Sequence, residues 1–179
     1  EVERTEKIQA RVFCHWGQVK NSETLKVGDT VLAEINDASR LNSARNHSAT
    51  HLLHAALRVI LGEQVQQRGS LVSQERLRFD FVHRHAVQQE QLQAIEDLVN
   101  QKIREDLSIN IDLVSYEEAV KRGAIALFTE KYQSEVRVVT MGNFSMELCG
   151  GTHVKRTGQI GFFKILNETG IAAGVRRIE

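Results

Sequence analysis

A chain of 179 residues, of which 41% are hydrophobic, is long enough for one domain with a buried core, or for one domain with a small appendage. No apolar run approaches the roughly 20 residues of a membrane span, and no signal-peptide pattern is present. The 23 Lys and Arg residues balance the 23 Asp and Glu residues, so no net charge attracts the chain to nucleic acid. Two cysteines do not make a disulfide framework, so we expect a reducing, cytoplasmic location.

The first 36 residues are expected to be rich in β-strands. Ile8, Ala10 and Val12 alternate with polar residues, and the apolar run Val31–Ile35 follows a turn signal at Val27–Asp29. Strands this few and this short cannot close a core of their own. The chain does not begin with methionine, and we expect it to be a piece of a longer protein.

A long helix is predicted from residue 37 to residue 61. Apolar residues recur there at helical spacing, a glycine follows the last of them, and Asp37 or Ser39 is expected as the N-cap. His47 and His51 stand four residues apart, so both imidazoles leave the same face of the helix. Two such nitrogens can hold one metal ion, although tetrahedral zinc needs further ligands.

The histidine pair alone leaves open which side chains would bind. His54 lies on the same helix face, so the spacing does not decide which two histidines are ligands. A metalloprotease is excluded because Ser48 stands where the His-Glu-x-x-His motif needs its glutamate. A nucleobase deaminase is excluded because its Pro-Cys-x-x-Cys motif cannot occur in a chain without proline.

The remaining elements predict an α+β fold, with an antiparallel sheet packed on long helices. Apolar periodicity predicts a second long helix over 88–106, and Ser115–Glu118 has the capping-box spacing of a short helix that Gly123 can end. A further helical turn or two is expected over 124–132. Apolar residues predict strands at 77–81, 109–113, 136–139, 144–148, 160–166 and 171–178, the last two joined by Asn167–Gly170.

A second metal-binding pattern follows the strand at 144–148. Cys149 and His153 stand four residues apart across two glycines, which let a loop fold back so that sulfur and nitrogen converge. We therefore predict a zinc site made of His47, His51, Cys149 and His153, which supply one thiolate and three imidazoles. In such a site the cysteine is deprotonated and each imidazole is neutral.

The motif residues resemble those of the editing domain of bacterial-type alanyl-tRNA synthetase. Five segments carry this resemblance: Asn46–His54, Gly69–Val72, Leu77–Phe81, Leu148–His153 and Gly170–Glu179. Free-standing alanyl-tRNA editing proteins and the editing domain of threonyl-tRNA synthetase share the zinc pattern. The threonyl motif resembles Cys-x-Gly-Pro-His rather than the Cys-Gly-Gly-Thr-His found here.

The resemblance implies hydrolysis of the ester that joins wrongly attached serine or glycine to tRNA(Ala), with Zn²⁺ as the cofactor. The implied site residues are Cys149, His47 and His51 at the catalytic centre and Thr50, Gln67 and Ser70 in contact with the amino acid. Residues 1–36 would be the last strands of a truncated β-barrel, and residues 37–179 the editing core. The partners would be the acceptor end of tRNA(Ala) and the rest of the synthetase in cis, with no membrane involved.

Three other readings stay open at this point. The chain could be a free-standing deacylase, an RNA-binding module with structural zinc, or a metal-independent interaction domain. Deacylation of mischarged tRNA, with and without zinc, distinguishes these classes.

Overall fold

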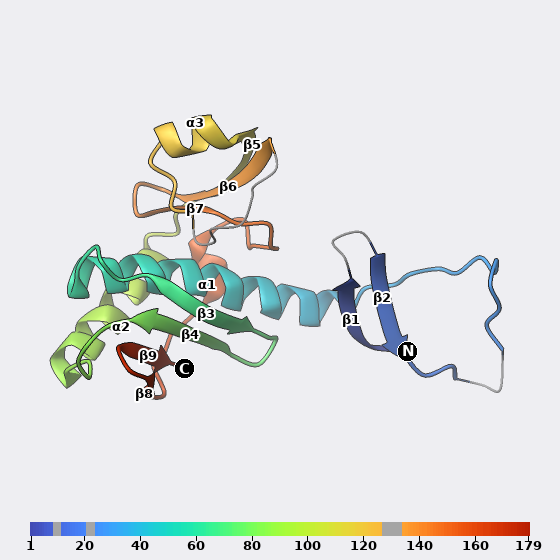
Figure 1. Cartoon of the computed structure of the whole chain (residues 1–179), viewed down its shortest axis with the longest axis horizontal. Helices are drawn as coiled ribbons and strands as arrows, with labels where there is room; N and C mark the ends of the chain where they lie inside the picture. The colour runs from blue at the N-terminus through green and yellow to red at the C-terminus, as the bar shows by residue number, and fades with distance from the viewer. Residues whose placement is uncertain (9–11, 21–23, 127–133) are drawn as a thin grey trace. The chain divides into compact units, whose positions relative to one another are not determined.

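Figure 1 shows a computed structural model of the protein, which describes residues 1–8, 12–20, 24–126 and 134–179. The chain divides into two compact units, Glu1–Ile35 and Asn36–Glu179. No helix among the described residues combines the length and the apolar character needed to cross a membrane.

The first unit contains a β-hairpin. Strands β1 (Val2–Ile8) and β2 (Val12–Gly17) pair antiparallel, in agreement with the expected β-rich start, although Ala10 lies outside the described residues. The predicted strand at Val31–Ile35 is wrong, because these exposed residues pair with no other strand of the described chain. A strand needs partners for its backbone N–H and C=O groups, which an apolar sequence does not supply. No described side chain of this unit is buried, and its two strands form no closed barrel.

The second unit is α+β, as predicted, but its strands form two antiparallel sheets rather than one. Its elements are α1 (Asp37–Leu61), β3 (Gln67–Val72), β4 (Leu77–Val82), α2 (Gln89–Arg104), β5 (Ile109–Ser115), α3 (Tyr116–Lys121), β6 (Glu135–Met141), β7 (Ser145–Leu148), the 3-10 turn η1 (Thr157–Ile160), β8 (Glu168–Ala172) and β9 (Val175–Ile178). The strand orders are β3-β4-β9-β8 and β5-β6-β7. Helix α1 contacts β3 and β4 of one sheet and β7 of the other, so both sheets share it (Figure 1).

The predicted ends of α1 are confirmed, but its N-cap is Asn36 rather than Asp37 or Ser39. Asn36 Oδ1 accepts a hydrogen bond from the Ser39 N–H at 3.0 Å, which satisfies one of the free donors of the first turn. Gly62 follows the helix with a φ of 112°, which glycine adopts without strain. Helix α2 lies within its predicted range.

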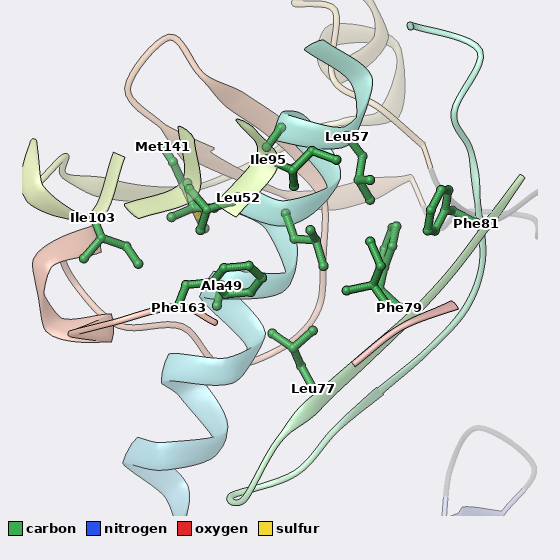
Figure 2. Packing of buried hydrophobic residues seen from close by; sticks show 14 of the residues in the cluster. Ala49, Leu52, Leu57, Leu77, Phe79, Phe81, Ile95, Ile103, Met141 and Phe163 are labelled. Carbon is green, nitrogen blue, oxygen red and sulfur yellow. The ribbon is translucent and has the colours of Figure 1, made fainter. Parts of the chain in front are cut away.

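The core of this unit joins α1 to β4 and α2 (Figure 2). Leu52 and Leu57 of α1, Phe79 and Phe81 of β4, and Ile95 of α2 are fully buried. Each side chain of this size stabilises the fold by about 1.5–3 kcal/mol when it is buried rather than exposed. Helix α1 is therefore held firmly, and side chains elsewhere on it have fixed positions.

The predicted strand at 160–166 is wrong, because side chains of α2 take its backbone hydrogen bonds. Asn100 donates to the Phe163 C=O at 2.8 Å and accepts from the Phe163 N–H at 2.9 Å. Glu96 accepts from the Ile165 N–H at 2.8 Å. The last hairpin is formed by β8 and β9 instead, and it turns at Gly174 with a φ of 70°.

Three further segments differ from expectation. The predicted connection Asn167–Gly170 lies mostly in β8. The segment that forms β3 was not predicted as a strand, because it is polar. It is an edge strand of its sheet, and an antiparallel sheet can expose polar side chains on one face. In place of the expected helical turn, Ile125 forms a parallel bridge with Glu147. Residues 127–132 of that prediction lie outside the described residues.

Candidate metal centre

Two distant segments of the chain meet at α1. His47 and His51 project from the helix one turn apart. Cys149 directly follows β7 and is 102 residues from His47 in the sequence. The loop after Cys149 brings His153 back to the same place. The potential ligand atoms of these four residues all lie within 4.8 Å of one another. The spacing therefore predicted a group of side chains that the structure does bring together.

The second glycine of the loop allows it to approach the helix. A Cβ atom at Gly151 would overlap Cε1 and Nδ1 of His47, far inside the 3.0 Å that real Cβ contacts respect. A Cβ at Gly150 would meet nothing within 4 Å. Arg137 Nη1 donates to both loop carbonyls, at 2.6 Å from Gly150 O and 3.0 Å from Gly151 O. Sequence reasoning misses Arg137, because a single charged residue in a strand gives no sign of what it contacts.

The surroundings of Cys149 favour its thiolate form. His47 Nε2 lies 3.4 Å from the sulfur, and the Gly151 N–H donates to the sulfur at 3.5 Å. Burial opposes the charged form, but the neighbouring imidazoles of the cluster, led by His153, outweigh it and lower the pKa of Cys149 to about 3. The thiolate is the form of cysteine that binds a metal.

Two of the imidazoles have the orientation that a metal ligand needs. His51 Nδ1 donates to Glu147 Oε2 at 2.7 Å, and His153 Nδ1 lies 3.3 Å from Ser48 Oγ, which also accepts the Val154 N–H at 3.2 Å. The Nε2 atoms of both rings are buried and have no hydrogen-bond partner among the described residues. Metal-binding histidines typically use one ring nitrogen for the ion and the other for such a partner. The residues therefore fit a metal, and this ligand set suits zinc.

The cluster also favours positive charge at its centre. Burial would lower the pKa of His51, but the nearby sulfur of Cys149 and the hydrogen bond to Glu147 raise that pKa to about 10. Burial would raise the pKa of Glu147, but its hydrogen bonds with His51 and His54 lower it to about 2. Burial lowers the pKa of His153. The negative charges of Cys149 and Glu147 on either side of His51 thus favour a positive charge at this place. A divalent cation bound to the ring nitrogens would supply that charge.

The sequence of this chain is similar to known proteins over its whole length. A family model described as the second additional domain of threonyl and alanyl tRNA synthetases matches residues 136–179, which carry Cys149 and His153. The alanine–tRNA ligase of Nitrosomonas eutropha is 57% identical over 99% of this chain and 20% of its own length. Those of Ruthia magnifica and Neisseria meningitidis serogroup B are 54% and 55% identical over all of this chain, and over 21% and 20% of their own lengths. The chain matches an editing-domain region of the alanine–tRNA ligase type. It spans about a fifth of the length of these relatives.

The third histidine of α1 does not join the cluster of candidate metal ligands. His54 Nδ1 donates instead to Glu147 Oε1 at 2.8 Å, so His47 and His51 are the helix residues that converge with Cys149. Sequence reasoning misses Glu147. Its position in the sequence could have indicated it. Glu147 stands two residues before Cys149, and side chains at i and i+2 of an extended chain leave the same side.

The three residues predicted to contact the amino acid lie on two elements. Thr50 is buried on α1, and its Oγ1 donates to the Asn46 C=O at 2.8 Å. Gln67 and Ser70 lie on β3, where Gln67 Nε2 donates to Ser70 Oγ at 3.1 Å. In the register they lie opposite Phe81 and Phe79 of β4, but Gln67 is only half-buried and Ser70 is exposed. Contact of these residues with an amino acid stays a prediction.

Proposed function

We propose that this chain hydrolyses the ester of serine or glycine wrongly attached to tRNA(Ala), with Zn²⁺ held by His47, His51, Cys149 and His153. The observation that carries the proposal is the convergence of these four side chains, together with the buried, unpartnered Nε2 atoms of His51 and His153. The similarity to alanine–tRNA ligases supports the choice of tRNA(Ala).

The reaction has a clear physical purpose. A pocket that accepts alanine cannot exclude the smaller glycine, and it rejects an added hydroxyl group only weakly. A second, hydrolytic site tests the product again. The chain would act in cis with the rest of a synthetase, in the cytoplasm, on the acceptor end of tRNA(Ala). Residues 1–36 would be the last strands of a β-barrel subdomain, and residues 37–179 the editing core.

The side chains of the cluster would bind and orient the reacting groups. When bound, zinc would supply Lewis-acid chemistry, which polarises an ester carbonyl or activates water. Cys149 contributes the negative charge that keeps the ion in place, and α1 fixes the spacing of His47 and His51. An aminoacyl ester is already a reactive electrophile, so positioning contributes more than strong activation.

Selectivity would come from polar groups that fit the seryl hydroxyl. Because Thr50 Oγ1 gives its proton to the Asn46 carbonyl, its remaining lone pairs can only accept a hydrogen bond. Thr50 would therefore accept from the hydroxyl of serine, a group that alanine lacks. Gln67 and Ser70 would line the opposite wall of the pocket.

The decisive experiment is deacylation of seryl-, glycyl- and alanyl-tRNA by the 179-residue chain, with zinc and with a chelator. We expect zinc-dependent release of serine and glycine and slow release of alanine. Zinc and tRNA binding without deacylation would favour an RNA-binding module with structural zinc. Thermal stability that a chelator does not change would favour a metal-independent interaction domain. Equal rates for the isolated chain and for the chain joined to a whole synthetase would favour a free-standing deacylase.

A further inference from the structure

One buried carboxylate connects the metal cluster to a histidine outside it. Glu147 is 1% exposed, and the rings that it contacts, His51 and His54, are 3% and 1% exposed. Its two oxygens have different partners: Oε2 accepts from His51 Nδ1 at 2.7 Å, and Oε1 accepts from His54 Nδ1 at 2.8 Å. Both rings project from α1, so the carboxylate of β7 is held between two fixed donors.

This arrangement determines which nitrogen of His51 can bind a metal. An ionised carboxylate only accepts hydrogen bonds, so both rings must carry a proton on Nδ1. In a neutral His51 the lone pair is then on Nε2, the buried atom that has no partner among the described residues. Without an acceptor at Nδ1, the ring could carry its proton on Nε2 instead, and that proton would block the metal.

Glu147 also balances the charge of the centre. A divalent ion with one thiolate and three neutral imidazoles has a net charge of one positive unit. The carboxylate touches a ligand ring directly and makes the assembly neutral. A charge in a buried site without such a partner is costly, so the carboxylate favours the metal-bound state.

We propose that Glu147, held in place by His54, is a positioning residue that orients His51 as an Nε2 ligand and thereby sets the affinity of the site for its metal. The inference deepens the proposed function and rests on its assignment of a metal site. His54 is then a second donor that prevents the carboxylate from rotating, which explains a buried imidazole beside the cluster that is not a ligand.

The first test is the zinc dissociation constant of Glu147→Gln, measured by competition with a chelating dye on the whole chain. The matched control is Glu96→Gln, because Glu96 is also a buried carboxylate with two donors, Lys164 Nζ and the Ile165 N–H, each at 2.8 Å. In each variant one of the two carboxylate oxygens is replaced by an NH₂ group, which cannot accept, so one of the two donors loses its acceptor. We expect Glu147→Gln to bind zinc roughly 10- to 100-fold more weakly than the unsubstituted chain. Glu96→Gln should lower the melting temperature but leave the zinc affinity unchanged. Unchanged zinc affinity in Glu147→Gln, or an equal loss in both variants, would overturn the proposal.

The second test separates hydrogen bonding from packing at His54, and it decides the matter if Glu147→Gln does not fold. The amide nitrogen of asparagine lies close to the position of an imidazole Nδ1, whereas phenylalanine fills the space without a donor. We therefore expect His54→Phe to weaken zinc binding by roughly tenfold and His54→Asn to retain it. Equal affinities of the two variants contradict a role for the hydrogen bond. A chain that binds zinc in this pattern without deacylating seryl-tRNA refutes the proposed function alone, and a chain that binds no zinc refutes both.

Discussion

Replacement of Gly151 by alanine tests whether the metal centre depends on close approach between its loop and α1. The added methyl group would overlap the ring of His47, so the ring has to move away. The movement required is roughly 1 Å, whereas ligand distances in metal sites vary by only about 0.2 Å. His47 would then leave its place as a ligand. We expect zinc binding to weaken by at least about tenfold, the lower end of what a misplaced ligand costs.

The matched control is Gly150→Ala, one residue earlier, where the methyl group meets nothing within 4 Å. Neither glycine has a left-handed φ, so alanine is compatible with the backbone at both positions. Gly150→Ala should leave zinc binding unchanged and raise the free energy of unfolding by about 0.4–1 kcal/mol, because it restricts the unfolded chain. Zinc titration and chemical denaturation measure the two effects. Normal zinc binding by Gly151→Ala, or equal weakening in both variants, would refute the reasoning.

Three further variants test other parts of the site and the core. Cys149→Ala should lose zinc binding and most deacylation but still show a cooperative melting transition in the presence of chelator. If the variant is largely unfolded and its remaining folded molecules are fully active, the thiolate does not have the proposed role. Thr50→Val should narrow the ratio of seryl- to alanyl-tRNA hydrolysis by up to about 1–3 kcal/mol, or roughly 5- to 150-fold; an unchanged ratio moves selectivity to other residues. Burial opposes ionisation of Glu96, but hydrogen bonds led by that from Lys164 lower its pKa. Its contribution is therefore complete above the pKa of the unfolded chain and is lost as the pH falls through the lower folded value. Glu96→Gln should abolish that part of the acid sensitivity in pH-dependent denaturation, and an identical pH profile would contradict the assignment.

The sequence was most informative where a local repeat carries the signal. The ends of α1 follow from apolar periodicity and Gly62, and the two four-residue spacings at His47 and Cys149 identify side chains that do converge. Each of these features depends on neighbours within one helical turn or one loop. The N-cap differs by one residue, because Asn36 and Asp37 are both good caps and only the backbone decides between them.

The sequence was least informative where side chains from another element determine the local structure. The segment around Phe163 has the apolar alternation of a strand, but Asn100 and Glu96 of α2 bind its backbone and prevent pairing. Glu147 looked like an ordinary strand residue and His54 like a third candidate ligand, because their contact joins positions 93 residues apart. The division of the strands into two sheets has the same origin. Pairing between distant strands is not encoded in the pattern of either one.

The distance of 102 residues between His47 and Cys149 links metal binding to folding. In the unfolded chain these side chains meet rarely, because closing a loop costs entropy that increases with its length. The packed core of α1, α2 and the two sheets holds them together in the folded chain. A zinc ion should consequently bind the folded chain far more tightly than the unfolded one, and at a free zinc concentration 100 times the dissociation constant it would add about 2.7 kcal/mol to the free energy of unfolding. The supply of zinc would then govern how large a fraction of the molecules is folded, quite apart from any ester that they cleave.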